Sequence, residues 1–126
     1  MSLTVLIVDD NAINLKLARQ VLELAGHQVL TAVDAGQAQE VLASSRPDLV
    51  LMDISLPGMD GLSLVRLLRG DARHAGLRIV ALSALAMKED VARALDAGCD
   101  GFLSKPIDTR RFADDVAAFA APQEVP

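Results

Sequence analysis

Three aspartates, Asp9, Asp10 and Asp53, each stand at the end of a short apolar run. Carboxylates held within a few ångströms of one another repel, which raises the pKa of at least one of them unless a cation lies between. Oxygen ligands that leave room for several waters suit Mg²⁺, which commonly bridges carboxylates and phosphate oxygens. If the fold brings these aspartates together, the sequence predicts a Mg²⁺ site.

Lys105 and Ser83 stand at equivalent places, near the ends of two further apolar runs. An ammonium supplies a point charge for phosphate oxygens, and a hydroxyl can donate a hydrogen bond to the same group. Because no His, Cys or activated Ser is placed as a nucleophile, Asp53 is the best candidate; carboxylates do form aspartyl-phosphates. These side chains together predict phosphoryl transfer, in which positioning and charge neutralisation provide most of the catalysis.

Each of these residues also has an ordinary structural explanation. The pair Asp9-Asp10 could cap a helix, and Asn11 is a further capping candidate. Asp53 could be a turn residue, and Lys105 a solvated surface charge. Four separate apolar runs nevertheless each end in one of these polar residues. If the runs are parallel strands, their ends lie along one edge of the sheet, and the gathering of four polar groups at that edge favours a functional site.

The elements that must position these groups alternate between two patterns. Continuous apolar runs are typical of parallel strands buried on both faces, and apolar residues at a spacing of 3.6 indicate helices between them. The predicted strands are Val5–Val8, Gln28–Thr31, Leu49–Met52, Ile79–Leu82 and Gly101–Leu103. The residues expected on the buried helix faces are Leu15, Ala18, Leu22 and Ala25; Ala38, Val41 and Leu42; Gly61, Leu64, Val65 and Leu68; Met87, Val91, Ala94 and Leu95; and Phe112, Val116, Phe119 and Ala120.

This alternation predicts an α/β fold, with a parallel sheet covered by helices on both faces and right-handed crossovers. Ligands bind such sheets outside the carboxyl ends of the strands. The strand Gln28–Thr31 is followed only by Asp34, which has the character of a helix cap, so this strand is expected on the outside of the sheet.

Composition limits the class of protein. The 126 residues are 52% hydrophobic and 23% charged, which predicts one folded domain over residues 1–121 with a tail at 122–126. A net charge of −5 and only 2% aromatic residues argue against nucleic-acid binding. No apolar run approaches the roughly 20 residues that span a bilayer, so no membrane association and a cytoplasmic location are expected. The single cysteine, Cys99, is expected to be a buried small hydrophobe, and His27, which follows Gly26 at a helix end, is expected at the surface or facing the helix dipole.

Five segments, taken in order, resemble the receiver domains of two-component response regulators, the CheY-like superfamily. The resemblance extends over about residues 4–120 and is greatest to DivK-like stand-alone receivers and to receivers of hybrid histidine kinases. It implies a flavodoxin-like, doubly wound (βα)5 fold with strand order 2-1-3-4-5. The segments are Val5–Asp10, Asp48–Asp53, Leu56–Gly61, Ala81–Ala84 and Gly101–Pro106.

The resemblance also implies roles for individual residues. Asp53 would accept a phosphoryl group from the phosphohistidine of a histidine kinase or a histidine phosphotransferase, and Lys105 would pair with Asp53 and then with the phosphate. The metal Mg²⁺ would be held by Asp10, Asp53 and the carbonyl of Ser55, with Asp9 holding a metal-bound water. Ser83 and Phe102 would form the switch that follows phosphorylation.

Two further surfaces follow from the same resemblance. A downstream protein partner would bind the face made by the fourth helix, fifth strand and fifth helix, roughly residues 87–119. The kinase would dock around the first helix and the rim loops. The residues that tune dephosphorylation would be Ser55 and Leu85. Because Leu85 cannot hydrogen-bond to water, a long-lived phosphoryl group is expected.

Two other functions stay open at this point. A small haloacid-dehalogenase-like phosphatase also uses an aspartate nucleophile and Mg²⁺, but it would want a second Asp at the position of Ser55. An interaction module that is never phosphorylated is the other alternative, and the full set of polar residues argues against it. Nucleotide binding is disfavoured because neither glycine-rich phosphate-binding motif occurs.

Overall fold

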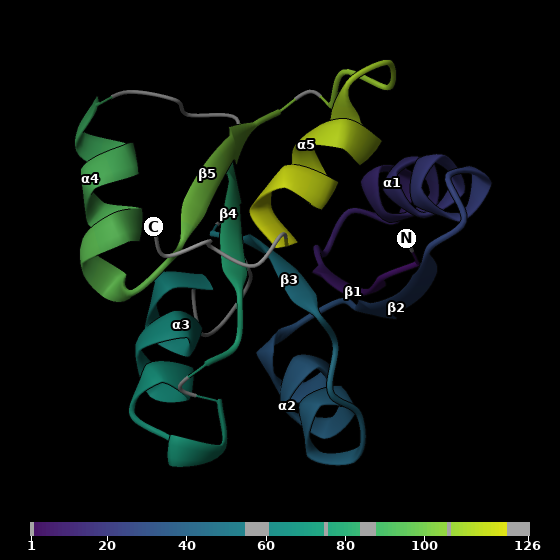
Figure 1. Cartoon of the computed structure of the whole chain (residues 1–126). Helices are drawn as coiled ribbons and strands as arrows, with labels where there is room; N and C mark the ends of the chain where they lie inside the picture. Colours follow the sequence, from purple (N-terminus) through teal and green to yellow (C-terminus); the bar gives the residue numbers. More distant parts are fainter. Residues whose placement is uncertain (1, 55–60, 75, 84–87, 106, 121–126) are drawn as a thin grey trace, which may run out of the picture.

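The computed structural model describes residues 2–54, 61–74, 76–83, 88–105 and 107–120. Within those residues a central sheet is covered by helices on both faces (Figure 1). The strands are β1 (Thr4–Val8), β2 (Gln28–Ala32), β3 (Leu49–Asp53), β4 (Ile79–Ser83) and β5 (Gly101–Ser104). The helices are α1 (Ala12–Leu24), α2 (Ala35–Ser44), α3 (Gly61–Arg69), the short 3-10 helix η1 (Ala72–His74), α4 (Lys88–Ala97) and α5 (Phe112–Ala120).

The strands are parallel and lie in the order β2-β1-β3-β4-β5, which confirms the predicted flavodoxin-like fold. Strand β2 lies at the edge, as expected. Each strand boundary falls within one residue of its predicted position. The continuous apolar runs were informative because a parallel strand that is covered on both faces needs apolar residues at successive positions.

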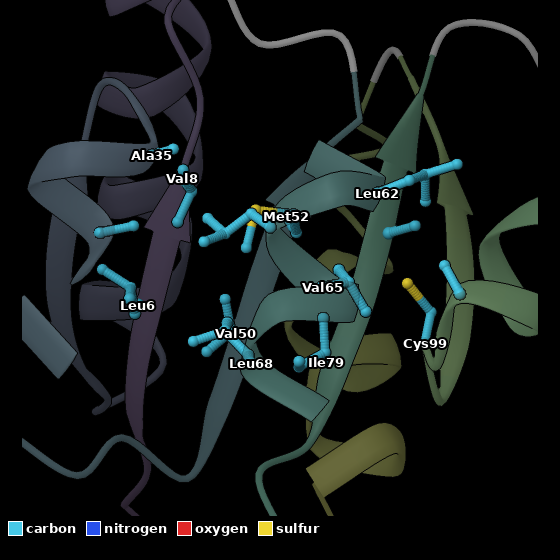
Figure 2. Close-up of a cluster of buried hydrophobic side chains, with 14 of the residues drawn as sticks. Leu6, Val8, Ala35, Val50, Met52, Leu62, Val65, Leu68, Ile79 and Cys99 are labelled. Atoms are coloured by element: carbon cyan, nitrogen blue, oxygen red, sulfur yellow. The ribbon is translucent and has the colours of Figure 1, made fainter. Parts of the chain in front are cut away.

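The core consists of two clusters, one on each face of the sheet. Successive side chains of a strand point to opposite faces, so Leu6 and Val8 enter one cluster while Val5 and Ile7 enter the other. Helices α2, α3 and α4 pack on the first face (Figure 2), and α1 and α5 pack on the second. All four residues of Leu49–Met52 in β3 are fully buried, so the strand that ends at Asp53 is held from both sides.

Local chemistry explains where the helices begin and end. The Asn11 side chain accepts hydrogen bonds from the backbone N–H groups of Ile13 and Asn14, and it is the N-cap of α1. Asp34 caps α2 in the same way, as predicted. Gly26 and Gly98 follow α1 and α4 with φ angles of 94° and 115°, a left-handed conformation that glycine adopts without steric cost.

Two predictions of buried helix positions were wrong. Ala25 was expected on the buried face of the first helix, but it is the C-cap residue and is exposed. Leu95 was expected in the core, but half of its surface (50%) is exposed, and α4 buries Ala94 and Ala97 instead. The spacing of Ala94 and Ala97 places them on the face toward the sheet, where small residues let the helix approach closely. Met87 lies outside the described residues.

The surface position predicted for His27 was also wrong. The His27 side chain is buried, and its Nδ1 accepts a hydrogen bond of 3.0 Å from the backbone N–H of Leu3. Leu3 is itself buried just before β1 begins, so its N–H group needs an acceptor. The imidazole supplies that acceptor and ties β1 to the start of β2. None of the helices in the described residues is long and apolar enough to cross a membrane.

Candidate functional site

Four adjacent strands deliver polar side chains to one rim of the sheet. Asp9 directly follows β1, Asp53 ends β3, Ser83 ends β4 and Lys105 directly follows β5. The backbone N–H of Lys105 donates to the carbonyl of Ser83 at 2.8 Å, which fixes the end of β5 against the end of β4. The predicted convergence at the carboxyl ends of the strands is therefore what the structure shows.

Lys105 joins two of the aspartates. Its Nζ donates to Oδ2 of Asp53 and contacts Oδ2 of Asp9, both at 2.9 Å. Asp9 and Asp53 are 1% and 3% exposed, so these charges are largely removed from water. An ion pair removed from water is tightly held, because breaking it would leave an uncompensated buried charge.

Burial and hydrogen bonding shift the pKa values of Asp9 and Lys105 in opposite directions. Burial raises the pKa of Asp9, although the backbone N–H of Asn11 and the Lys105 ammonium both act to lower it. Burial alone would lower the pKa of Lys105, but its hydrogen bonds to Asp53 and Asp9 outweigh that effect and raise the pKa. Lys105 is therefore a fixed positive charge at the rim.

The carboxylates of Asp9, Asp10 and Asp53 offer oxygens that lie within 4.8 Å of one another. With all three ionised, three negative charges and the Lys105 ammonium leave a formal charge of −2, which a divalent cation would balance. The donors are oxygens, which suit Mg²⁺ better than Zn²⁺, and the exposed Asp10 leaves the cluster open to the waters that Mg²⁺ retains. The donor set fits the expected metal. Ser55, the remaining expected ligand, lies outside the described residues.

Helix capping does not account for the aspartate pair. The N-cap of α1 is Asn11, and the Asp9 carboxylate points elsewhere: Oδ1 accepts from the backbone N–H of Asn11 at 2.9 Å, and Oδ2 contacts Lys105. Asp10 is exposed beside them. Helix capping, the structural explanation considered for Asp9 and Asp10, is therefore carried out by Asn11. The carboxylates of Asp9 and Asp10 both belong to the acidic cluster at the rim.

The two expected switch residues occupy neighbouring strands. Ser83 is buried at the end of β4 and pairs in register with Ser104. Phe102 lies in β5 opposite Ala81, is half-buried, and packs against the core cluster on the α2, α3 and α4 face. Leu85 lies outside the described residues.

Gly61 is a residue of the site whose importance the helical pattern did not reveal. The pattern predicted it only as part of a buried helix face. A Cβ at this position would overlap the backbone carbonyl oxygen of Asp53 and would lie 2.7 Å from Cα of Ile54. Gly61 therefore lets α3 begin directly against the end of β3. The available signal was a glycine at the start of a helix that follows a strand, which can mark a close backbone approach.

Known proteins with similar sequences and structures support one family. The family model described as response regulator receiver domain matches residues 5–117. The polar-differentiation response regulator DivK of Brucella anthropi is 35% identical over 119 residues, covering 94% of this chain and 97% of DivK.

Two solved structures agree with this assignment. The signal receiver domain of a signal transduction histidine kinase from Syntrophus aciditrophicus superposes with a TM-score of 0.83 at 31% identity, over 93% of this chain and 89% of that one. The chemotaxis response regulator CheY4 of Vibrio cholerae shares the fold with a TM-score of 0.88 at 24% identity, over 94% and 99% of the two chains. From its acidic rim, its strand order and these similarities, the chain belongs to the response regulator receiver domain family of two-component signalling.

Proposed function

We propose that Asp53 accepts a phosphoryl group from the phosphohistidine of a histidine kinase or a histidine phosphotransferase. A carboxylate oxygen of Asp53 forms the new bond to phosphorus while the phosphorus–nitrogen bond breaks, and the imidazole leaves with the bonding electron pair. The observation that best supports this proposal is the buried contact of Lys105 Nζ with Asp53 Oδ2 at 2.9 Å, in a rim that also holds two further carboxylates.

The neighbouring groups have complementary roles in this proposal. Lys105 holds the Asp53 carboxylate before transfer and pairs with the phosphoryl oxygens afterwards. Asp10, Asp53 and the carbonyl of Ser55 would hold Mg²⁺, with Asp9 holding a metal-bound water. When bound, Mg²⁺ would supply positive charge to the phosphoryl oxygens.

The proposed output is a changed protein surface. The Ser83 hydroxyl donates a hydrogen bond to the phosphoryl group, and Phe102 then rotates into the space that Ser83 releases. Phe102 has no hydroxyl, so its rotation acts through burial and shape. The partner surface is the α4-β5-α5 face, roughly residues 87–119, where the half-exposed Leu95 offers an apolar contact. We take residues 1–121 as the phospho-acceptor unit, which could equally relay the phosphoryl group onward.

Phosphoryl uptake tests this proposal directly. The protein is incubated with acetyl phosphate and Mg²⁺, and intact mass spectrometry counts phosphoryl groups. We expect one group on the wild type, none on Asp53→Asn, and one on the control Asp96→Asn, which removes an exposed carboxylate of α4.

Other outcomes would favour the alternative functions. If neither acetyl phosphate nor a panel of phosphorylated histidine kinases modifies the wild type, the domain is an interaction module that is not phosphorylated. If the protein turns over p-nitrophenyl phosphate repeatedly and Asp53→Asn abolishes the turnover, it is a phosphatase.

A further inference from the structure

An open groove lies where the carboxyl-terminal parts of α2 and α3 meet the short helix η1. Its volume is about 770 Å³. Two smaller hollows, of about 200 and 330 Å³, continue it past the end of α2 along Ser45–Pro47, and all three share Leu42, Arg73 and His74 in their linings. We call this continuous depression the basic groove. Figure 1 shows α2, α3 and the segment after α3 together at the same end of the sheet.

The basic groove is cationic although the chain carries a net charge of −5. Arg46, Arg66 and Arg73 line it, against one carboxylate, Asp71. Asp71 is already bound by Arg73 at 2.8 Å, and this pairing lowers the pKa of Asp71 to about 2. Within the described residues, the side chains of Arg46 and Arg66 make no hydrogen bond or ion pair. Two guanidinium groups are thus available for carboxylates, which they bind in bidentate geometry.

Apolar surface lies beside these arginines. Leu67 of α3 is 51% exposed and lines the same groove, where Leu42 and Leu68 form a buried floor. A leucine half open to water next to arginines is suited to a ligand that carries both aliphatic and acidic groups. Arginine also packs its aliphatic stem on apolar surface while its head stays free to pair.

The dipole of α3 explains only some of the arginines in and near the basic groove. Arg66 and Arg69 lie in the last turn of α3, where positive charge stabilises the helix terminus. Arg69 is already engaged with backbone carbonyls and Asp100, so it does not contribute to the groove. The dipole does not account for Arg73, which lies beyond the end of α3, or for the exposed Leu67.

We propose that the basic groove binds an acidic segment of a partner protein, with its carboxylates on Arg46 and Arg66 and an aliphatic side chain on Leu67. A peptide segment fits better than a small anion because the arginines are distributed along three connected hollows and are exposed. A small anion would need several donors converging on one buried point.

The location of the groove separates it from phosphoryl transfer. The rim with Asp53 lies at the carboxyl ends of the strands, whereas α2 and α3 end near the amino ends of β3 and β4. A segment in the basic groove would leave Asp9, Asp53 and Lys105 uncovered. The groove therefore binds its partner in both phosphorylation states, which is the behaviour of a tether rather than of an output switch.

Heteronuclear NMR titration tests this proposal on the whole chain. The ¹⁵N-labelled protein is titrated with a short blocked peptide of alternating glutamate and leucine, and with the same peptide carrying glutamine for glutamate. We expect the glutamate peptide alone to shift the signals of residues 39–46 and 66–74, with an effect that weakens as salt is added. Arg46→Gln and Arg66→Gln should each weaken binding about two- to fivefold. Arg93→Gln, which removes an exposed arginine of α4, should leave binding unchanged.

Several results would overturn the proposal. No shifts with either peptide, or equal shifts with both, would exclude recognition of carboxylates. The same shifts with inorganic pyrophosphate and none with the peptide would assign a small-anion site, and shifts on concentrating the protein alone would assign self-association. Phosphoryl uptake from acetyl phosphate should be normal in Arg46→Gln and Arg66→Gln, so a failure of groove binding is distinguishable from a failure of the proposed phosphoryl transfer.

Discussion

The backbone carbonyl of Asp53 occupies the space that a side chain on Gly61 would need. Strand β3 and helix α3 therefore touch backbone to backbone at the rim. Asp53 belongs to the acidic cluster and contacts Lys105, so a displacement of this backbone contact would move the Asp53 carboxylate relative to the Lys105 ammonium.

The first prediction concerns this contact. Gly61→Ala should destabilise the fold by about 1–3 kcal/mol, the usual cost of forcing an extra carbon into a packed site. It should also slow phosphoryl uptake at Asp53. Urea denaturation and intact mass spectrometry measure the two effects. Gly76→Ala is the matched control, because a Cβ there meets nothing within 4 Å. Equal stability of the two variants would contradict the prediction.

The acidic cluster predicts stabilisation by Mg²⁺. A ligand that binds only the folded state stabilises it by about 2.7 kcal/mol at a hundred times its Kd. Addition of Mg²⁺ to chelator-treated protein should therefore raise the Tm, as measured by calorimetry. Asp10→Asn should lose most of this rise, and Asp96→Asn should keep it. A similar rise in both variants would place the bound metal elsewhere.

The contacts of Arg69 predict that its side chain clamps the end of α3 to the segments that lead into β4 and β5. Its guanidinium donates to the carbonyls of Leu77 (2.6 Å) and Gly98 (2.8 Å) and to Oδ2 of Asp100 (2.8 Å). Arg69→Ala should cost about 2 kcal/mol or more in unfolding free energy. Arg69→Lys should recover only part of this loss, because an ammonium lacks the planar fork.

The control for this clamp is Arg93→Ala. The Arg93 side chain is 68% exposed, and its nearest contact with Asp90 is 3.8 Å. Its loss should change the unfolding free energy by no more than about 0.5 kcal/mol. If Arg69→Ala has as small an effect in urea denaturation as Arg93→Ala, the clamp does not contribute to stability.

Cys99 predicts a stability change at alkaline pH. Burial raises the pKa of its thiol to about 11, against 9.0 without burial, the value taken for the unfolded chain. Between these values the unfolded state has lost the proton and the native state still holds it, so this contribution to stability falls as pH rises and levels off above 11. Each unit of difference in pKa corresponds to about 1.4 kcal/mol, so the unfolding free energy should fall by roughly 2–3 kcal/mol across this pH range.

Two measurements check the behaviour of Cys99. The decline in stability between pH 9 and pH 11 should be shallower in Cys99→Ala, in which all other titrating groups are retained. Alkylation of native Cys99 near pH 8 should be roughly a hundredfold slower than in denaturant, because the thiolate is the reactive species. Rapid alkylation of the native protein would show that the thiol is accessible and ionised.

The sequence at Leu85 predicts slow loss of the phosphoryl group, given that Asp53 is phosphorylated as proposed. A leucine there cannot orient an attacking water. The decay of the phosphorylated protein should therefore be slow in the wild type and faster in Leu85→Glu, as followed by intact mass spectrometry. Leu95→Glu, on the exposed face of α4, is the matched control and should decay like the wild type. Rapid decay that is the same in all three proteins would falsify the prediction.

The parts of the molecule that the sequence revealed are those in which a local pattern and the global fold agree. The continuous apolar run Leu49–Met52 predicted a buried parallel strand, because a strand covered on both faces needs apolar residues at every position. Asp53 and Lys105 could be expected to meet because the carboxyl ends of parallel strands share one rim, although they lie 52 positions apart in sequence.

Other features depend on partners that no local pattern contains. His27 is buried because Leu3, far away in sequence, needs an acceptor for its N–H group. The role of Arg69 depends on the carbonyl of Gly98, which only the packed structure brings near. Leu95 has the spacing of a core residue, but the adjacent small residues Ala94 and Ala97 pack on the sheet in its place. Tertiary packing decides these cases.

All five strands of the sheet run in one direction, so the rim and the basic groove lie at its two ends and share no residue. A substitution of the exposed groove residues Arg46, Arg66 or Leu67 removes no member of the buried cluster around the strand that carries Asp53. In a lineage of such domains, the groove end can diverge and acquire a different protein ligand while the chemistry at the rim is retained. The fold thus lets the acidic rim and the basic groove change independently of each other under selection.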